Sequence, residues 1–328
     1  MTPTSTDTTS PRYERVTAKT VIALMAPNTW AAGIAPVLVG AALAFALPRS
    51  GFADSVYSVG LNARSIVVFA LMLVTSLLMQ SAANALNDHV DYAKGTDTAE
   101  NSVDLADVPL VSTNVDPGTG LHVAVGCLIA AAFTGGIVTV YAGWTLLWIG
   151  LAGAVAVVLY SSGKTPISYL PLGEVVSGSV MGLLIPLATV FALTGVLNWS
   201  VLLLALPTFL TIGAILMTNN TCDIVRDRHA GRRTLPILLG ERTSALVMAG
   251  AEALALTVVA WGVGALAPWG LPVVAVGTLM LARPVTGTAR DEYNYLVRPL
   301  RMKRVSGVTA LLALTYTIAL VTGALLNG

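Results

Sequence analysis

The stretch that decides the fold reads ARSIVVFALMLVTSLLMQSAANALNDHVDYAKGTD and covers residues 63–97. No charged side chain occurs between Arg64 and Asp88. A helix needs about 20 predominantly apolar residues to cross the hydrocarbon core of a bilayer. The stretch therefore predicts a membrane-spanning helix over 64–86, followed at once by a group of acidic side chains.

The same pattern of apolar runs recurs along the chain. Of the 328 residues, 55% are hydrophobic and only 11% are charged, against about 25% charged residues in a typical soluble domain. This composition excludes a soluble globular or a disordered protein and predicts an all-α, polytopic membrane bundle of about nine transmembrane helices. The nine predicted spans are 20–47, 64–86, 120–141, 143–160, 174–195, 199–219, 243–266, 268–289 and 305–327.

The distribution of basic residues predicts the orientation, because Lys and Arg accumulate in cytoplasmic loops. With the N-terminus in the cytoplasm, only Arg49 and Arg64 of the 18 basic residues fall outside. The C-terminus is then outside, and Trp144, Trp199 and Trp269 fall in the short outer loops, where interfacial aromatics are expected. We expect a multi-pass protein of the cell (inner or plasma) membrane. The cytoplasmic basic residues are Arg12, Arg15, Lys19, Lys94, Lys164, Arg226, Arg228, Arg232, Arg233, Arg242, Arg283, Arg290, Arg298, Arg301, Lys303 and Arg304.

The N-terminal residues, the cysteines and the distribution of basic and aromatic residues give further expectations about this protein. Residues 1–18 are polar and contain no apolar segment ahead of a cleavage site, so we expect a disordered cytoplasmic tail rather than a signal peptide. Residues 19–328 are expected to form a single transmembrane domain. Cys127 and Cys222 form no CxxC motif, and we expect both to be unpaired thiols. No basic stripe with interleaved aromatics is present, so nucleic acid is not an expected partner.

Polar side chains gather at the end of the second predicted span. If the helix continues past Leu86, its polar residues fall at relative positions 0, 4, 7, 8 and 11, which is one face of a 3.6-residue period. Polar groups at membrane depth usually face the bundle interior or a cavity. We call this set the first acidic stripe; it consists of Gln80, Asn84, Asn87, Asp88 and Asp91.

A second set follows the sixth predicted span. Asn219, Asp223 and Asp227 are spaced 0, 4 and 8, again one helix face, and form what we call the second acidic stripe. The pair Asn219 and Asp223 repeats the spacing of Asn84 and Asp88 after 135 residues. The repeat indicates two related halves.

Two facing acidic stripes repel each other unless a cation lies between them. Carboxylate and amide oxygens select a hard ion such as Mg²⁺, which keeps open positions for water and phosphate. Basic residues near both stripes favour a metal–diphosphate clamp over simple interfacial ion pairs. Ion pairing or loop solvation remains the better interpretation for Asp104, Asp107 and Asp116, which lack helical spacing.

At these motifs the chain resembles the UbiA superfamily of intramembrane aromatic prenyltransferases. The family's NDxxD motif matches Asn87–Asp91, and its DxxxD motif matches Asp223–Asp227. The longer forms NDxxDxxKGTD (residues 87–97) and NNxxDxxxDxxxGxxTLxxxLG (residues 219–240) are similar to the menaquinone branch, as are APVLVG at 35–40 and YSSGKTPISYLPLGE at 160–174.

The resemblance implies transfer of a polyprenyl group from polyprenyl diphosphate to an aromatic acceptor, with Mg²⁺ as cofactor. In the menaquinone branch the acceptor is 1,4-dihydroxy-2-naphthoate, which loses CO2 to give demethylmenaquinone. Another acceptor, such as 4-hydroxybenzoate or homogentisate, or a phosphoribosyl donor, remains an alternative. Outside this class, a secondary transporter also carries intramembrane carboxylates, although nearer the bilayer midplane.

The resemblance also implies roles for individual residues. Tyr160 has two readings, a hydrogen bond to phosphate or an interfacial anchor, and Asp97 has three, a metal ligand, a group that positions or deprotonates the acceptor, or a loop cap. Glu174 is either a helix cap or part of the site, and Glu252 has no assigned role. The expected metal ligands are Asn84, Asn87, Asp88, Asp91, Asp223 and Asp227; the expected diphosphate-binding residues are Lys94, Lys164, Arg228, Arg232 and Tyr160; the expected catalytic residues are Asp97, Lys94 and Tyr160.

Overall fold

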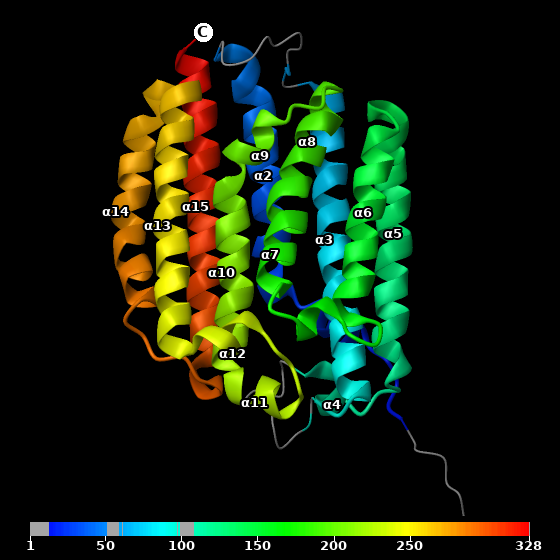
Figure 1. Ribbon diagram of the computed structural model, residues 1–328. Coiled ribbons are helices and arrows are strands. Elements are labelled where there is room, and N and C mark those ends of the chain that lie inside the picture. Colours follow the sequence, from blue (N-terminus) through cyan, green and yellow to red (C-terminus); the bar gives the residue numbers. More distant parts are fainter. Residues whose placement is uncertain (1–12, 51–58, 61, 97, 99–107, 328) are drawn as a thin grey trace, which may run out of the picture.

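A computed structural model describes residues 13–50, 59–60, 62–96, 98 and 108–327 of the chain. All regular secondary structure in these residues is helical, and the long helices run side by side as a bundle (Figure 1). The all-α class predicted from the apolar runs is therefore confirmed.

Seven helical segments in the described part of the chain are long and apolar enough to cross a membrane. An eighth helix, α6 (Thr145–Ser161), is apolar but has only 17 residues. The remaining predicted span is divided between α9 (Ser200–Leu204) and α10 (Leu206–Cys222). The total of nine spans stays a prediction. The seven long segments are Ala31–Arg49, Ala63–Ala93, Gly118–Ala142, Gly173–Thr194, Glu241–Leu266, Pro268–Thr288 and Tyr295–Leu326.

Two of the other predicted spans are interrupted as well. The first is split into α1 (Ala18–Leu24) and α2 (Ala31–Ala46), because Pro27 cannot donate a helical hydrogen bond and Ala26 has a left-handed backbone, with φ of 46°. The span at 174–195 consists of α7 (Gly173–Ser177), a π-helical segment η5 (Gly178–Leu184) and α8 (Ile185–Thr194). The continuous helices expected in these places were wrong in detail.

The other long helices keep close to the predicted limits or exceed them. The second span is extended at its acidic end, since α3 (Ala63–Ala93) includes the whole first acidic stripe without a break. The others are α5 (Gly118–Ala142), α13 (Glu241–Leu266), α14 (Leu271–Thr288) and α15 (Arg298–Leu326). Three short helices, α4 (Pro109–Ser112), α11 (Ile224–His229) and α12 (Leu235–Leu239), lie in the connections.

Small residues allow the helices to approach closely, as is common between helices in membranes. A Cβ added to Gly40 of α2 would lie 2.9 Å from Cα of Pro186 in α8, and one on Gly182 of η5 would lie 2.4 Å from the backbone of Phe209 in α10. α2 is the most enclosed span, with 72% of its apolar window buried, and it lies in the middle of the bundle (Figure 1).

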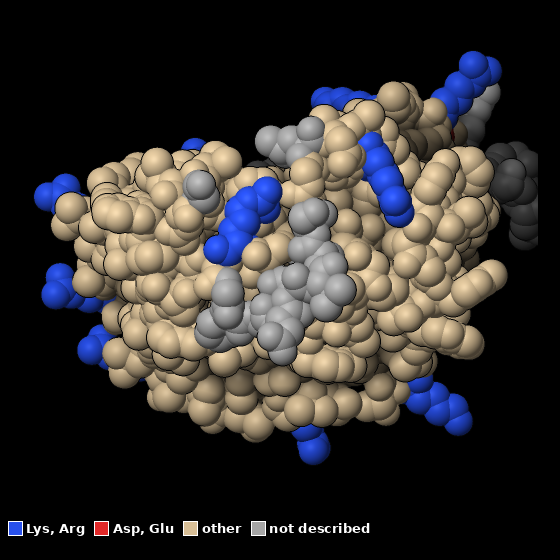
Figure 2. Space-filling model, turned by 90° about the horizontal axis from the view of Figure 1, so that it is seen from above, with Lys and Arg blue, Asp and Glu red and all other residues tan. Residues whose placement is uncertain are grey.

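The two ends of the bundle differ in their connections. The C-terminus lies at one end, whereas α4, α11 and α12 lie at the other (Figure 1). Figure 2 looks onto the C-terminal end, whose described surface carries only scattered Lys and Arg side chains. The position of α11, with Arg226 and Arg228, at the end opposite the C-terminus agrees with the predicted concentration of basic residues on one side of the bundle. Which end faces the cytoplasm remains a prediction.

Candidate active site

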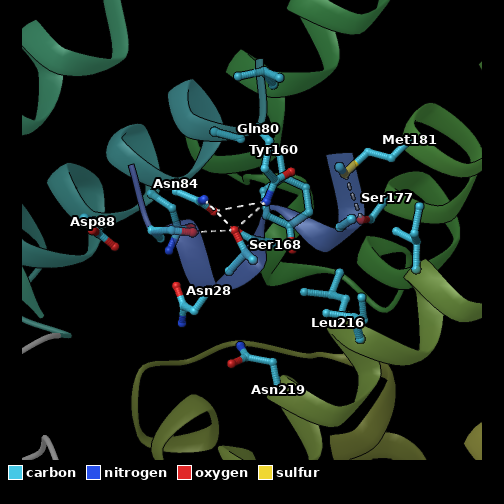
Figure 3. A pocket seen from close by; sticks show the side chains of 18 of the residues that line it. Asn28, Gln80, Asn84, Asp88, Tyr160, Ser168, Ser177, Met181, Leu216 and Asn219 are labelled. Atoms are coloured by element: carbon cyan, nitrogen blue, oxygen red, sulfur yellow. Dashed lines mark hydrogen bonds between the residues drawn. The ribbon is translucent and has the colours of Figure 1, made fainter. Parts of the chain in front are cut away.

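A cavity of about 570 Å³ opens between the helices of the two acidic stripes. Its polar wall includes Asn84, Asn87 and Asp88 of α3, with Asn219 of α10 on the other side (Figure 3). Apolar side chains from α6, η5, α10 and α15 form a further part of the wall: Ala156, Val157, Val180, Met181, Ile212, Ile215, Leu216 and Met302. The cavity thus combines a polar rim with an apolar interior.

Part of the first acidic stripe holds the segment between α1 and α2. Nδ2 of Asn84 donates to Oγ1 of Thr29 at 2.9 Å and to the carbonyl of Met25 at 3.2 Å. Nε2 of Gln80 donates to the same Thr29 hydroxyl at 3.2 Å, and Figure 3 shows dashed lines that start from the side chains of Gln80 and Asn84. These bonds place the turn at Pro27–Thr29 (η1) against the cavity. Asn84 therefore has a structural role, and its role as a metal ligand stays a prediction.

The next turn of α3 carries the amide and the carboxylate closest to the helix end. Nδ2 of Asn87 donates to Oδ2 of Asp91 at 3.0 Å, while Oδ1 of Asn87 accepts from Ser161 at the end of α6 at 3.2 Å. Residues four apart lie on one helix face, so the predicted register over this turn agrees with the observed contact. Asp91 is buried here, with 6% of its surface exposed.

The second acidic stripe crosses a helix break. α10 ends at Cys222 and α11 begins at Ile224, so Asp223 separates the two helices. The bonds from the Asp223 amide to the Asn219 carbonyl (3.2 Å) and from the Asp227 amide to the Asp223 carbonyl (2.8 Å) preserve the four-residue spacing. The expected continuous helix was wrong, yet both carboxylates remain buried near the cavity end of the bundle.

Two arginines connect the acidic side chains. Arg232 forms ion pairs with Asp91 of α3 and, at 3.4 Å, with Asp227 of α11. Nε of Arg298, at the start of α15, lies 3.3 Å from Oδ2 of Asp223 and donates to Oδ1 of Asn219 at 2.9 Å. Arg232 and Arg298 also line the cavity. Each acidic stripe is therefore paired with an arginine that also lines the cavity.

Burial is the main influence on the pKa of the Asp227 carboxyl group. Removal from water raises the pKa of this carboxyl to about 7, the positive charge of Arg232 opposes the rise, and Asp223 adds to it. Oδ2 of Asp227 is buried and finds no hydrogen-bond partner among the described residues. An anionic oxygen in this position can accept a further cation.

The donor set fits Mg²⁺, provided that other ligands complete the coordination. Asp91, Asp223 and Asp227 supply hard oxygen donors, one of which is the unpartnered Oδ2 of Asp227. No group of three His, Cys, Asp or Glu side chains in the described ranges is close enough to hold a metal alone. Mg²⁺ is usually bound by one or two carboxylates together with water and substrate phosphates. The residues therefore suit a metal that arrives with a phosphorylated ligand.

The remaining predicted site residues divide into two groups. Tyr160 of α6 lines the cavity (Figure 3), and Nζ of Lys94 lies 4.3 Å from the ring centre of Tyr169. Lys164 and Arg228 are exposed and are not part of the cavity wall. Their assignments stay predictions. Asp97, Asp104 and Asp107 lie outside the described residues.

His89, Asp116, Glu252 and the two cysteines are not part of the cavity wall. Nδ1 of His89 lies 2.9 Å from the carbonyl of Pro117, at the start of α5. Asp116 is exposed and accepts from the amide of Gly118 at 2.7 Å. Glu252 is fully buried in α13. Both cysteines, Cys127 and Cys222, are buried and unpaired, as predicted.

Several cavity residues are given no role in the sequence analysis, although some stand in the quoted motifs. Asn28, Ser168 and Asn220 line the cavity but belong to no acidic stripe. Arg298 entered only the count of cytoplasmic charges, although it contacts the second acidic stripe. Tyr169 stands in the matched 160–174 segment, and its ring lies 5.1 Å from Cζ of Arg232. Only the three-dimensional packing reveals these contacts.

Comparisons with known proteins agree with this architecture. The model of the UbiA prenyltransferase family matches residues 33–294. A 1,4-dihydroxy-2-naphthoate octaprenyltransferase of Bacillus subtilis (strain 168) is 32% identical over 271 residues, which is 82% of each chain. A protein of the same name from Haemophilus influenzae is 28% identical over 65% of this chain and 67% of its own.

A solved structure supports the fold independently. A UbiA homolog from Archaeoglobus fulgidus bound to GPP and Mg²⁺ superposes with a TM-score of 0.62 at 14% identity, covering 92% of this chain and 99% of its own. The family match spans both acidic stripes and the cavity-lining residues from Gln80 to Arg232. The chain belongs to the UbiA prenyltransferase family and is a membrane prenyltransferase.

Proposed function

We propose that the protein transfers a polyprenyl group from polyprenyl diphosphate to 1,4-dihydroxy-2-naphthoate in a Mg²⁺-dependent reaction, with loss of CO2. The observation that carries the proposal is the cavity, whose wall combines Asn84, Asn87 and Asp88 of the first acidic stripe, Asn219 of the second and two arginines with apolar side chains. The names of the Bacillus and Haemophilus relatives support the naphthoate as acceptor.

The polar rim suits the diphosphate of the donor. Arg232 and Arg298 line the cavity, and an arginine can bind two phosphate oxygens at once. Tyr160 offers a hydroxyl on the same wall. Lys94, Lys164 and Arg228 lie on the outer side of the site and are proposed to contact the diphosphate when it is bound.

The acidic residues are proposed to hold the metal. Asn87, Asp88, Asp91, Asp223 and Asp227, with Asn84 at the edge of the set, would hold Mg²⁺. A bound Mg²⁺ stabilises the negative charge that grows on the leaving group. In this arrangement Arg232 exchanges its carboxylate partners for phosphate oxygens.

The apolar interior suits the chemical step and the prenyl chain. The C–O bond of the allylic diphosphate breaks, the diphosphate leaves with the electron pair, and the ring carbon that bears the carboxyl group forms the new C–C bond. The bond to the carboxyl group then breaks, its electrons restore the aromatic ring, and CO2 departs. Met181, Ile215 and Leu216 line the interior and would keep water away from the allylic cation. Asp97 is proposed to position the acceptor or to take its proton.

The proposed location is the cytoplasmic face of the cell membrane. The cavity lies toward the bundle end that carries α4, α11 and α12, because Asn219 and Arg298 stand at the ends of α10 and α15 near those connections (Figure 1). The sequence places the great majority of basic residues in the same connections, which favours the cytoplasm for this end.

One assay tests the proposal. The purified protein in detergent is supplied with Mg²⁺ and a polyprenyl diphosphate and is offered 1,4-dihydroxy-2-naphthoate, 4-hydroxybenzoate and homogentisate in parallel. We expect a prenylated, decarboxylated product from the naphthoate alone. Product from one of the other acceptors alone would overturn the proposed acceptor but not the reaction class. The Asp88→Ala variant serves as the matched negative control.

A further inference from the structure

A buried carboxylate and a buried amide form a pair at the wall of the cavity. Nδ2 of Asn220 in α10 donates to Oε1 of Glu174 in α7 at 2.8 Å. Both side chains are buried, with 8% of Asn220 and 6% of Glu174 exposed. The second oxygen of Glu174, Oε2, is buried and has no hydrogen-bond partner among the described residues. Neither residue belongs to an acidic stripe.

The pair fixes the orientation of the Asn220 amide. An ionised carboxylate only accepts hydrogen bonds, so it must face the NH2 side of the amide. Asn220 is also part of the cavity wall. With Nδ2 directed to Glu174, the carbonyl Oδ1 is the atom of this amide that is left to meet a ligand. The cavity therefore has a hydrogen-bond acceptor at a defined position of its wall.

The oxygen that Asn220 offers is a hydrogen-bond acceptor and is therefore unsuited to bind the phosphate oxygens, which also only accept. In the part of the chain that the structure describes, Glu174 forms no ion pair, whereas both described arginines of the cavity are paired with aspartates. Val176 and Ser177, which follow Glu174 in the chain, line the cavity beside Asn220. A neutral acceptor between apolar and hydroxyl groups matches an O–H donor better than an anion whose oxygens only accept.

We propose that Asn220, whose side-chain amide is oriented by Glu174, binds a hydroxyl group of the aromatic acceptor. Oδ1 of Asn220 accepts the hydrogen bond, and Glu174 acts as a positioning residue that does not touch the substrate. The inference rests on the proposed function and adds the residues that recognise the acceptor. It explains why a carboxylate is buried behind the wall, since the burial of an unpaired carboxylate is otherwise unfavourable.

Three variants separate the two roles. Asn220→Ala removes the acceptor atom, Glu174→Leu removes the group that orients it, and Glu174→Gln keeps an oxygen that still accepts from Nδ2 of Asn220. The matched control is Glu252→Gln, because Glu252 is an equally buried carboxylate in α13 and is not part of the cavity wall. Size-exclusion profiles and apparent melting temperatures in detergent establish that each variant is folded.

The readout is the Michaelis constant for each substrate. We expect Asn220→Ala and Glu174→Leu to raise the KM for 1,4-dihydroxy-2-naphthoate ~10-fold or more, because a polar group at a site built for it is left unpaired. The KM for the polyprenyl diphosphate and the Mg²⁺ concentration for half-maximal rate should stay at wild-type values. Glu174→Gln should restore the acceptor KM to near wild type, and Glu252→Gln should leave all three constants unchanged.

A second measurement identifies the hydroxyl group. Binding of 1,4-dihydroxy-2-naphthoate and of its two monomethyl ethers is measured by titration calorimetry. For the ether that blocks the recognised hydroxyl, wild-type protein and Asn220→Ala should bind equally weakly, while the difference between them persists for the other ether. Such a loss of discrimination is not expected of a residue that only supports the fold.

The outcomes are distinguishable. A folded Asn220→Ala variant with a wild-type KM for the naphthoate, or with a changed requirement for Mg²⁺ or diphosphate alone, would overturn the inference. If the wild-type protein prenylates another acceptor and not the naphthoate, the proposed acceptor fails, and the same three variants with that acceptor still test the role of Asn220. A Glu174→Gln variant as impaired as Glu174→Leu would overturn the positioning role.

Discussion

Arg232, which follows α11, donates a hydrogen bond to the carboxylate of Asp91 in α3, 141 positions earlier in the chain. The same guanidinium lies 3.4 Å from Oδ1 of Asp227, so one permanent positive charge joins the two acidic stripes. The side chain of Arg232 is only 11% exposed, and an ion pair at this depth is screened little by salt. This contact ties the two halves of the site together.

Replacing Arg232 should therefore have opposite effects without and with a metal ion. In the presence of EDTA, Arg232→Gln should lower the stability by about 3 kcal/mol, because two buried carboxylates lose their counter-ion. Addition of Mg²⁺ should raise the apparent melting temperature of the variant more than that of the wild type, since the ion compensates the missing charge.

Thermal unfolding in detergent checks this expectation. Arg228→Gln is the matched control, because Arg228 lies in the same segment but is exposed, and its replacement should leave both melting temperatures within the error of the wild type. A variant of Arg232 that responds to Mg²⁺ no more than the wild type would contradict a metal site between these carboxylates.

Turnover should require a divalent cation. The cavity wall includes the carboxylate of Asp88 and several amides, and anionic groups without a metal repel a diphosphate. Chelation with excess EDTA should abolish product formation, and Mg²⁺ added beyond the chelator should restore it. Full turnover in EDTA would refute the magnesium site. Product analysis by mass spectrometry, with heat-treated protein as the blank, measures the effect.

Cysteine labelling tests the orientation. Trp144 is 75% exposed in the turn between α5 and α6, and this turn lies at the same end of the bundle as the C-terminus (Figure 1). Ala93 is exposed and is the last residue of α3, two positions after Asp91 of the first acidic stripe. Trp144→Cys and Asn327→Cys should react with an impermeant maleimide in intact cells, and Ala93→Cys should react only after permeabilisation. The native Cys127 and Cys222 are buried and should contribute little background. The reverse pattern would invert the predicted topology.

The sequence predicts most of α3 correctly because the signals there are local. The apolar run and the spacing from Gln80 to Asp91 lie on one continuous helix, and no distant contact alters their register. The break at Asp223 is different: α10 ends where Arg298, from a helix much later in the chain, contacts the second acidic stripe. Local periodicity contains no information on such a contact.

The same reasoning applies to the amides of the cavity. The four-residue spacing identified Asn84 as part of a stripe, but its bonds to Met25 and Thr29 depend on how the N-terminal segment folds back. Asn220 stands in the matched 219–240 segment but is given no role there, because its partner Glu174 lies 46 positions away. Helix faces follow from sequence, whereas partners across the bundle follow from tertiary packing.

Close helix contacts near the cavity should be sensitive to a single methyl group. Gly182→Ala would bring a Cβ to within 2.4 Å of the backbone of Phe209, and overpacking of this kind costs about 1–3 kcal/mol. Gly250→Ala in α13 is the control, since nothing lies within 4 Å of its added Cβ and alanine favours a helix. The first variant should lower the apparent melting temperature in detergent, and the second should maintain or raise it. Equal melting temperatures would show that η5 and α10 do not pack as described.

Acidic residues of the two stripes should differ sharply from an acidic residue of a loop. Asp88→Ala and Asp227→Ala should each lower turnover by ~10³-fold or more, because the loss of a group that stabilises transition-state charge costs roughly 3–4 kcal/mol. Asp116→Ala should stay within a few-fold, since Asp116 is exposed and its carboxylate accepts from the nearby amide of Gly118. Expression and folding should change little in all three, because Arg232 keeps its ion pair with Asp91 when Asp227 is replaced. The measurement is kcat at saturating donor and acceptor, which makes the comparison independent of the natural acceptor. Asp116→Ala as damaging as Asp88→Ala would mean that the loop before α5, and not the stripes, carries the reaction.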